Sequence, residues 1–292
     1  MHKAGFVNII GSPNVGKSTL MNKLVGEKLS IITSKAQTTR HRIMGIVNGE
    51  DHQIVYSDTP GIVEPAYKLH ESMLNFVQNA LSDADVFLVM VEVGERQFKN
   101  EILADSINSS NVPALVLINK IDLSDQEGVE TAVEHWKKVF PKAKVLPVSA
   151  LHGFNVDGVM KLIADLLPES PPFFPKDQLT DKPMRFFTSE IIREKILLYY
   201  SKEIPYACEV IVESYKVQPD IIRIRAVILV ERESQKGIII GKDGIALKKV
   251  GTEARRDIEA FTGQKVFLEL FVKVEKNWRS NTSKLKRFGY IQ

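Results

Sequence analysis

The sequence predicts an α/β protein in which a doubly wound, mixed sheet is followed by a small α+β domain. Up to about residue 167, short apolar segments alternate with segments of helical period, a pattern typical of a parallel sheet with crossover helices. Beyond a proline-rich stretch the order becomes helix, strand, strand, helix, strand. The 292 residues are enough for two hydrophobic cores, at roughly 150 residues per domain.

The elements of the first domain follow from apolar runs that end at turn residues. Buried strands are expected at 6–10, 53–57, 86–91, 114–118 and 145–148, and helices at 17–25, 68–81, 128–140 and 156–167. Ile43–Val47 is followed by Asn48-Gly49, a pair that suits a tight two-residue turn. We therefore expect this run to form an antiparallel hairpin with the strand at 53–57.

Prolines mark the boundary between the two domains. Pro168, Pro171 and Pro172, with the polar residues up to Pro183, do not suit a helix or a central strand. We place the first domain at 1–170, a linker at 171–184 and the second domain at 185–292. The second domain is expected to contain a helix at 189–202, strands at 209–217 and 221–231, a helix at 245–261 and a strand at 266–274.

Composition excludes several classes of protein. Apolar residues make up 44% and charged residues 26%, which argues against a disordered or collagen-like chain. The longest apolar run, Val86–Val91, is too short to span a bilayer and the start lacks a signal-peptide pattern, so a cytoplasmic location is expected. The single cysteine, Cys208, allows no internal disulfide. The net charge is +3, but Ser234–Gln292 holds 13 Lys and Arg against 6 Asp and Glu. This basic end suits either a solvated surface or a polyanion-binding face.

The strongest motif lies directly after the first strand and opens the first helix. It is a phosphate-binding loop: Gly11, Ser12, Pro13, Asn14, Val15, Gly16, Lys17, Ser18 and then Thr19. Glycines allow the backbone N–H groups to surround phosphate oxygens. Lys17 is expected at the β- and γ-phosphates, and the Ser18 hydroxyl at Mg²⁺.

A second motif selects the base. Asn119, Lys120 and Asp122 follow the strand at 114–118, at the sheet edge where doubly wound folds bind ligands. The Asp122 carboxylate can accept the N1–H and amino N–H of guanine, a donor pair that adenine lacks, while the Lys120 stem lies over the ring. Ser149-Ala150, after the last strand, offers the Ala150 N–H to guanine O6. Together the motifs predict a GTP and GDP site.

A third element contacts the metal and the γ-phosphate. Asp58-Thr59-Pro60-Gly61 follows the strand at 53–57, so Asp58 is expected to hold Mg²⁺ through water and the Gly61 N–H to sense the γ-phosphate. Of the loop threonines, we favour Thr39 over Thr38 as the residue that closes over the metal. Ile62 occupies the place where Ras-type GTPases have a water-orienting glutamine, so slow intrinsic hydrolysis is expected.

Asn14 has two interpretations. Its amide closes the phosphate-binding loop by a hydrogen bond, or its oxygen joins backbone carbonyls of the first switch loop in binding K⁺ beside the phosphates. Lys17, Thr39 and Gly61 are expected to act in catalysis, and in the second case Asn14 acts with them.

One motif in the second domain indicates RNA binding. Gly241-Lys242-Asp243-Gly244 follows Ile238, Ile239 and Ile240 and precedes a helix containing Lys248, Lys249 and Arg255. A Gly-x-x-Gly turn is the loop of KH domains, which clamps about four nucleotides of a single strand. We expect the three isoleucines to line the groove floor, Lys242 to contact phosphate and Asp243 to help cap the helix.

These residues together resemble the Era family of bacterial GTPases over nearly the whole chain. The resemblance is carried by the phosphate-binding loop, Gln37–Arg42, Asp58–Gly61, Asn119–Asp122, Ser189–Lys195, and Val230–Glu233 before the Gly-x-x-Gly turn. It implies a P-loop GTPase domain and a type II KH domain, a monomer that binds the single-stranded 3′ end of 16S ribosomal RNA and assists assembly of the 30S subunit. It also implies loose, peripheral contact with the inner membrane.

Two other functions remain open at this point. In the first, a signalling GTPase uses its basic end to bind a protein or anionic lipid, and changing Gly241 and Gly244 leaves partner binding intact. In the second, a P-loop phosphotransferase acts on a small-molecule acceptor and is indifferent to Asp122→Asn.

Overall fold

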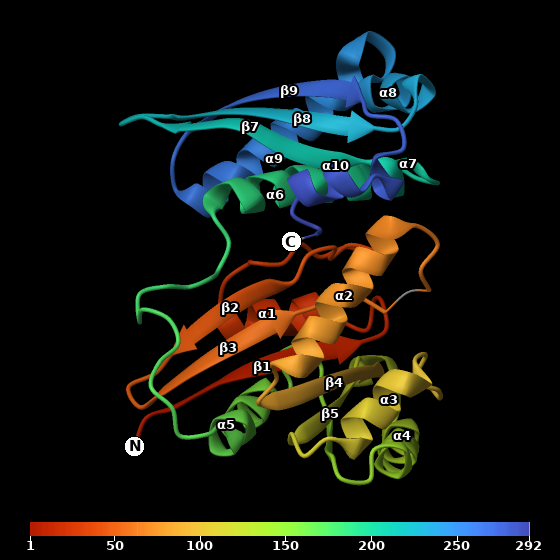
Figure 1. The fold of residues 1–292 in the computed structure, drawn as a ribbon, viewed down its shortest axis with the longest axis vertical. Coiled ribbons are helices and arrows are strands. Elements are labelled where there is room, and N and C mark those ends of the chain that lie inside the picture. Colours follow the sequence, from red (N-terminus) through yellow and green to blue (C-terminus); the bar gives the residue numbers. More distant parts are fainter. Residues whose placement is uncertain (63, 292) are drawn as a thin grey trace. The chain divides into compact units, whose positions relative to one another are not determined.

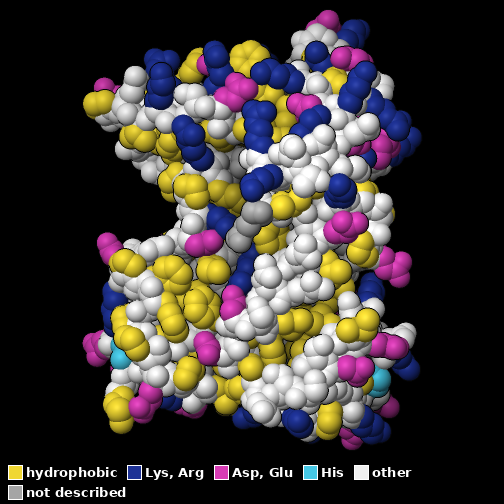
Figure 2. Space-filling view, viewed as in Figure 1, with side chains coloured by type: hydrophobic (Ala, Val, Ile, Leu, Met, Phe, Trp, Pro, Cys, Tyr) yellow, Lys and Arg dark blue, Asp and Glu magenta, His cyan; other side chains and the backbone are white. Residues whose placement is uncertain are grey.

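The structure, a computed structural model, describes residues 1–62 and 64–291 and divides into two compact units. Unit 1 comprises Met1–Pro65 and His70–Asp181, and unit 2 comprises Ala66–Leu69 and Lys182–Gln292. Each unit has its own sheet and helices (Figure 1). Figure 2 shows that Lys and Arg side chains gather on the visible face of unit 2, as the charge distribution predicts. No helix in the described ranges meets the length and apolarity that a bilayer span requires.

Unit 1 is built on a six-stranded sheet with the order β2-β3-β1-β4-β5-β6. β2 runs antiparallel to β3 and every other neighbouring pair is parallel, so the predicted doubly wound mixed sheet is confirmed. Its elements are β1 Lys3–Gly11, α1 Lys17–Val25, β2 Ile43–Asn48, β3 His52–Asp58, α2 Lys68–Ser82, β4 Val86–Glu92, α3 Glu101–Ser109, β5 Ala114–Asn119, the 3₁₀ turn η1 Ile121–Leu123, α4 Gln126–Val139, β6 Lys144–Pro147 and α5 Val156–Leu166.

The parallel register brings the chemically important segments to one edge of the sheet. Ile9 of β1 pairs with Asp58 of β3, Gly11 with Met90 of β4, and Glu92 of β4 with Asn119 of β5. Each strand end is followed by a loop at this edge. The phosphate-binding loop, the Asp58 loop and the Asn119 loop therefore converge there.

The core of unit 1 lies on both faces of the sheet. One face is covered by α2, α3 and α4, whose buried Val77, Ile107 and Trp136 pack with strand residues such as Val89 and Val116 (Figure 1). On the other face α1 packs with α5. Burial of these apolar faces holds the sheet edge in a fixed shape.

Two local predictions in unit 1 are corrected. Asn48 pairs with Gln53 as the last residue of β2, and the Gly49 N–H donates to the His52 carbonyl, so the turn lies beyond the predicted Asn48-Gly49 pair. The Asn48 side chain explains this, because it accepts a hydrogen bond from Gln53 (2.7 Å) in the ladder. Helix α3 was not predicted. Asn100 caps it by accepting from the Leu103 N–H (2.9 Å).

The segment expected as a linker is attached to the sheet of unit 1. The Ile46 N–H donates to the Leu179 carbonyl (2.8 Å), and Gln53 bonds the backbone of Phe173 and Phe174. The compact units separate at Asp181 and Lys182. The prolines prevent a helix here, but the backbone still pairs with the exposed edge of β2.

Unit 2 is a three-stranded sheet with the order β7-β8-β9. β7 and β8 are antiparallel and β8 and β9 are parallel. Ile192 and Ile196 of α6 and Val250 and Ile258 of α9 are fully buried against one face of this sheet. The elements are α6 Met184–Tyr199, α7 Ile204–Ala207, β7 Glu209–Val217, β8 Ile222–Val230, α8 Glu233–Ile240, the 3₁₀ turn η2 Lys242–Gly244, α9 Ile245–Thr262, β9 Val266–Val274, the 3₁₀ turn η3 Trp278–Ser280 and α10 Thr282–Arg287.

The order of unit 2 contains a helix that the sequence pattern did not reveal. Glu233–Ile240, to which no element was assigned from the sequence, forms α8. Its glycine and β-branched isoleucines are weak helix formers. The Gln235 side chain accepts from the Arg232 N–H (3.0 Å), and Ile239 is fully buried, so capping and packing outweigh local propensity.

Candidate functional site

The phosphate-binding loop wraps around the entrance to α1. Gly16 has φ 104° at the N-cap position and Asn14 has φ 65°, both in the left-handed region. Lys17 is buried, and its Nζ donates to the carbonyl oxygens of Gly11 (3.0 Å) and Ser12 (2.9 Å). The first N–H groups of α1 and the Lys17 ammonium thus form a cradle for anionic oxygens.

Asn119 connects this loop to the loop after β6. Its Nδ2 donates to the Val15 carbonyl (2.7 Å), and its Oδ1 accepts from the Ala150 N–H (2.9 Å). This corrects one prediction: the Ala150 N–H, expected to meet guanine O6, is directed at Asn119. Asn119 therefore fixes the spacing between the phosphate end and the base end of the site.

The base end is held by charged hydrogen bonds. Asp122 Oδ1 accepts from the Ser149 hydroxyl (2.6 Å), and this bond lowers the pKa of the Asp122 carboxyl. Lys120 has φ 63°, and its Nζ donates to Glu92 (2.8 Å). The carboxylate is therefore ionised and oriented, and the Lys120 stem is restrained at its end.

Three oxygen-bearing side chains meet beside the start of α1. The Ser18 hydroxyl donates to Asp58 Oδ2 (2.7 Å) and lies 2.9 Å from the Thr39 hydroxyl. Thr38 instead bonds Thr33 and the Lys35 carbonyl, each at 2.6 Å. Burial raises the pKa of Asp58, and its Oδ1 is buried with no hydrogen bond of normal geometry. The arrangement favours Thr39 over Thr38.

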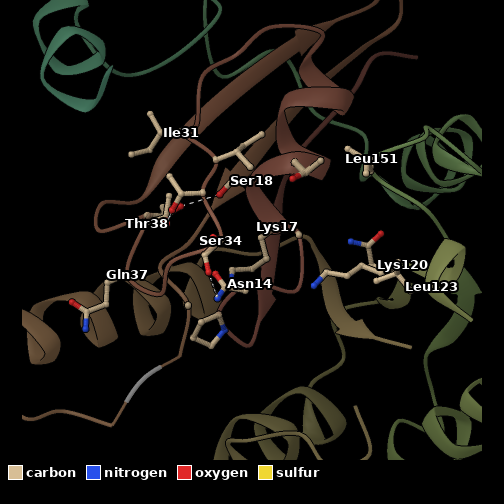
Figure 3. Close-up of a pocket in the computed structure, with 18 of the residues that line it drawn as sticks. Asn14, Lys17, Ser18, Ile31, Ser34, Gln37, Thr38, Lys120, Leu123 and Leu151 are labelled. Atoms are coloured by element: carbon tan, nitrogen blue, oxygen red, sulfur yellow. Dashed lines mark hydrogen bonds between the residues drawn. The ribbon is translucent and has the colours of Figure 1, made fainter. Parts of the chain in front are cut away.

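A cavity of about 510 Å³ joins these parts. Figure 3 shows Asn14, Lys17 and Ser18 between the loop of Ser34, Gln37 and Thr38 on one side and Lys120, Leu123 and Leu151 on the other. The predicted residues that line it are Pro13, Asn14, Gly16, Lys17, Ser18, Thr19, Thr39, Gly61, Asn119, Lys120 and Asp122.

Other predicted residues do not line the cavity but lie behind its wall. They are Gly11, Ser12, Val15, Asp58, Thr59, Pro60, Ile62, Ser149 and Ala150. The Thr59 hydroxyl is buried against the Ile9 carbonyl (2.7 Å), and Ile62 belongs to the apolar core. Neither the Thr59 nor the Ile62 side chain therefore reaches into the cavity. Burial of Ile62 agrees with the inference that it orients no water.

Sequence reasoning missed several residues of the site. Glu92 holds Lys120, and Glu95 accepts from the Ser12 hydroxyl (2.7 Å). Both glutamates follow the strand at 86–91 at the ligand-binding edge, a position that could have revealed them. The apolar wall residues Ile31, Ile32 and Leu151 lie in irregular segments that carry no such signal, and Leu123 ends the 3₁₀ turn η1.

Burial lowers the pKa of the Lys17 ammonium to about 8. We expect GTP affinity to be constant below that pH and to fall above it, by at most about tenfold per pH unit, because a neutral Lys17 must regain a proton to meet the phosphates. Calorimetric titration from pH 7 to pH 9.5 measures this. Lys17→Arg binds less well but keeps its charge, and it also controls for deprotonation of guanine N1. Parallel pH profiles in the two proteins would contradict the assignment.

Unit 2 contains a separate groove of about 360 Å³. It is lined by Gly244, Leu247, Lys248, Gly251, Thr252, Arg255, Leu268 and Leu270. A β-carbon at Gly251 would lie 3.3 Å from Leu270, so the glycine keeps the groove open. Apolar leucines beneath two cationic side chains suit a ligand with flat bases and a phosphate backbone.

The Gly-x-x-Gly turn lies at one end of this groove. Gly241 (φ 72°), Asp243 (φ 52°) and Gly244 (φ 74°) are left-handed, and Gly244 is the N-cap of α9. No side chain caps this helix, so the predicted capping role of Asp243 is wrong. The exposed Lys242 and Asp243 leave the first N–H groups of α9 available to an anion.

Two further predicted contacts are corrected. None of the three isoleucines lines the groove: Ile239 is fully buried in the core, Ile240 packs partly buried against that core, and Ile238 is half exposed. Helical geometry explains the difference, because neighbouring residues of α8 face different sides. The ammonium of Lys249 lies 4.1 Å from the centre of the Tyr199 ring and does not line the groove.

Comparisons with known proteins agree with these two sites. The model of the 50S ribosome-binding GTPase family matches residues 6–120, and that of the KH domain matches residues 203–279. The GTPase Era of Staphylococcus haemolyticus (strain JCSC1435) is 45% identical over 293 residues, covering 100% of this chain and 98% of its own. The chain belongs to the Era family of GTPases. A second Era, from Staphylococcus epidermidis, is 44% identical over the same length.

Solved Era structures share this fold over the whole chain. A crystal structure of Era in complex with MgGDPNP and nucleotides 1506–1542 of 16S ribosomal RNA has a TM-score of 0.95 and 41% identity, covering 100% of both chains. An Aquifex aeolicus Era variant bound to GDP·AlF₄⁻ has the same TM-score and identity and covers 99% of this chain. The GTPase match thus lies mainly in unit 1 and the KH match lies in unit 2. The predicted family, fold class and GTPase activity are confirmed.

Proposed function

We propose that this Era-family GTPase couples its nucleotide state to binding of the 3′ end of 16S ribosomal RNA and thereby assists maturation of the 30S subunit. The observation that carries this proposal is the groove in the KH domain. Its leucine floor, the uncapped start of α9, and Lys248 and Arg255 match the bases and phosphates of a single strand. The Era relative whose structure contains that RNA supports the choice of sequence.

Mg²⁺ fits the cluster of Ser18, Thr39 and Asp58. All three supply oxygen ligands, which Mg²⁺ prefers, and the buried Asp58 Oδ1 has no hydrogen bond of normal geometry. Ser18 and Thr39 would supply hydroxyl oxygens to the ion, and Asp58 would hold it through water. When bound, Mg²⁺ neutralises charge on the β- and γ-phosphates. An Era relative is described with MgGDPNP, which supports this ion.

Hydrolysis is expected to depend on the loop residues in the absence of a water-orienting glutamine. Lys17 would bind the phosphates, and the Gly61 N–H would donate to the γ-phosphate. Gly61 lies close against the phosphate-binding loop, since an added β-carbon would lie 2.8 Å from Pro13 Cα. GTP-dependent ordering of the two switch loops would then set RNA affinity, and hydrolysis would release the RNA.

Asn14 connects the phosphate-binding loop to the first switch loop, since its Nδ2 donates to the Ser34 carbonyl (3.0 Å). If the amide turns so that its oxygen takes the place of Nδ2, that oxygen and the Ser34 carbonyl can bind K⁺ together. We expect faster GTP turnover in K⁺ than in Na⁺, by roughly tenfold or more if the ion replaces part of an arginine finger. Phosphate-release assays in matched chloride salts measure this, and Asn14→Ala should abolish the difference. Equal wild-type rates in both salts would exclude the ion.

The RNA proposal is tested by fluorescence anisotropy with a labelled single-stranded RNA of the 16S 3′ sequence. Tighter binding is expected with a non-hydrolysable GTP analogue than with GDP or no nucleotide. Gly241→Asp with Gly244→Asp should weaken binding at least tenfold, because the added carboxylates repel the RNA phosphates where they approach the turn. Gly263→Asp is the matched control, since this left-handed glycine caps the far end of α9 in open space. Full RNA affinity in the double variant, or identical affinity in every nucleotide state, would contradict the proposal.

Three further parts of the proposal rest on the family resemblance. They are association with the 30S subunit, a monomeric state, and a cytoplasmic location with peripheral contact to the inner membrane. Sedimentation of the protein with 30S particles in each nucleotide state measures the first directly.

A further inference from the structure

The open face of the KH sheet presents aromatic rings to solvent. Along β9, residues 268, 270 and 272 pack toward the helices, so Phe267 and Phe271 point to the opposite face. Their exposed fractions are 46% and 44%. Four residues along a strand separate the rings by about 13 Å. Two large exposed rings on one sheet face are unusual for a surface without a ligand.

Cationic side chains lie beside both rings. The guanidinium of Arg223 is 5.3 Å from the centre of the Phe267 ring, and that of Arg225 is 5.3 Å from the centre of the Phe271 ring. Lys216 of β7 is paired with Arg223 in the ladder. Figure 2 shows Lys and Arg side chains interleaved with hydrophobic ones where β8 and β9 lie.

Acidic side chains compensate this charge only in part. Glu269 lies 3.6 Å from Arg225, and Glu213 lies 3.2 Å from Lys273, in exposed pairs that contribute little. Within residues 1–62 and 64–291, neither Arg223 nor Lys216 has a carboxylate partner. The surface therefore has an excess of positive charge around two stacking rings. Alternating rings and guanidinium groups are the composition of single-strand stacking platforms.

This surface and the RNA groove lie on the two faces of the same strand. Leu268 and Leu270 line the groove from one face of β9, and Phe267 and Phe271 lie on the other face of the same strand. β9 is an edge strand of the sheet. A nucleic acid strand that leaves the groove can reach the rings by passing around the edge that β9 forms.

We propose that the face formed by Lys216, Arg223, Arg225, Phe267 and Phe271 is a second RNA-binding surface, on which unpaired bases of the strand that leaves the groove stack. The inference rests on the proposed RNA function and extends it: the groove holds about four nucleotides, and this face binds those beyond them. The Arg223 and Arg225 guanidinium groups would contact phosphates between the stacked bases.

The test compares two RNA lengths with full-length protein. One oligonucleotide has about four nucleotides and fills only the groove, and the other contains the same segment within about twelve. We expect the wild type to bind the longer RNA more tightly. Phe267→Ser with Phe271→Ser should weaken binding of the longer RNA by roughly tenfold or more and leave the short RNA unchanged. Phe267→Tyr with Phe271→Tyr keeps both rings and should retain full affinity.

Controls separate stacking from charge and from folding. Val217→Ser, at a 65% exposed position of the same sheet, should change neither affinity. Arg223→Gln with Arg225→Gln should make the dependence of log affinity for the longer RNA on log salt concentration shallower by about 1.4. All variants should keep wild-type thermal stability and GTP turnover.

The outcomes distinguish this inference from the groove itself. If the Phe267→Ser, Phe271→Ser protein binds the longer RNA as tightly as the wild type does, the inference is wrong. Binding of the short RNA by the Gly241→Asp, Gly244→Asp protein tests only the proposed function. Wild-type protein that binds neither RNA would overturn both. Vesicles of phosphatidylglycerol and phosphatidylcholine provide the remaining test: if the serine variant loses vesicle binding but keeps RNA binding, the face contacts membrane and the inference is wrong.

Discussion

Asp122→Asn is expected to change the nucleotide preference of this GTPase from guanine to xanthine. The carboxylate accepts two N–H groups of guanine, and an amide presents one acceptor and one donor, which suits the carbonyl that xanthine has in place of the amino group. Asp122 lies at the base end of the cavity and is oriented by Ser149 (2.6 Å). GTP affinity should fall by on the order of 100-fold or more, since sites built around paired hydrogen bonds reject mismatched groups strongly.

Competition of GTP and XTP against a fluorescent GDP analogue measures the change. Asp125→Asn is the matched control, because Asp125 is also acidic and close in sequence but caps α4 through the Gly128 N–H (2.9 Å). Asparagine caps a helix about as well as aspartate, so this control should keep wild-type affinity. Unchanged guanine preference in Asp122→Asn would mean that another group reads the base.

Gly16→Ala is expected to abolish nucleotide binding almost completely. An added β-carbon would lie 2.2 Å from Asn119 Nδ2 and would occupy a left-handed position at φ 104°. Asn119 cannot retreat without losing its bonds to Val15 (2.7 Å) and Ala150 (2.9 Å), which join the two ends of the site. We expect GTP affinity to fall by at least about 100-fold, since two buried hydrogen bonds at about 1–1.5 kcal/mol each and the left-handed strain are at stake.

Isothermal titration with GTP measures the loss. Gly26→Ala is a close control, because Gly26 is left-handed (φ 82°) at the other end of the same helix, with no atom within 4 Å of an added β-carbon. It should cost about 1–2 kcal/mol of stability and leave the affinity unchanged. Gly16→Ala protein that binds GTP within threefold of wild type would show that the Asn119 connection is not needed.

Much of the fold and of the nucleotide site was accessible from the sequence because their signals are local. Helix α1 and strands β7 and β9 have the predicted bounds, since apolar period and flanking turn residues mark them within a few positions. Lys17, Ser18 and Asp122 were found through short motifs whose spacing is set by one loop each. Predictions that depended on a neighbouring loop were less successful. The Ala150 N–H donates to Asn119, and no side-chain hydrogen bond caps the start of α9.

Local pattern by itself determined the order of elements, the family and the residue types available for phosphate, base and metal. Only the tertiary structure decided which of them share a cavity, because register brings Asp58, Glu92 and Asn119 to one sheet edge from positions far apart in the chain. Tertiary packing also made Glu233–Ile240 helical and placed Ile239 in the core, since burial outweighs the weak helix propensity of this segment. Strand alternation placed Phe267 and Phe271 opposite the groove, a relation that appears only once the sheet and its covering helices are in place.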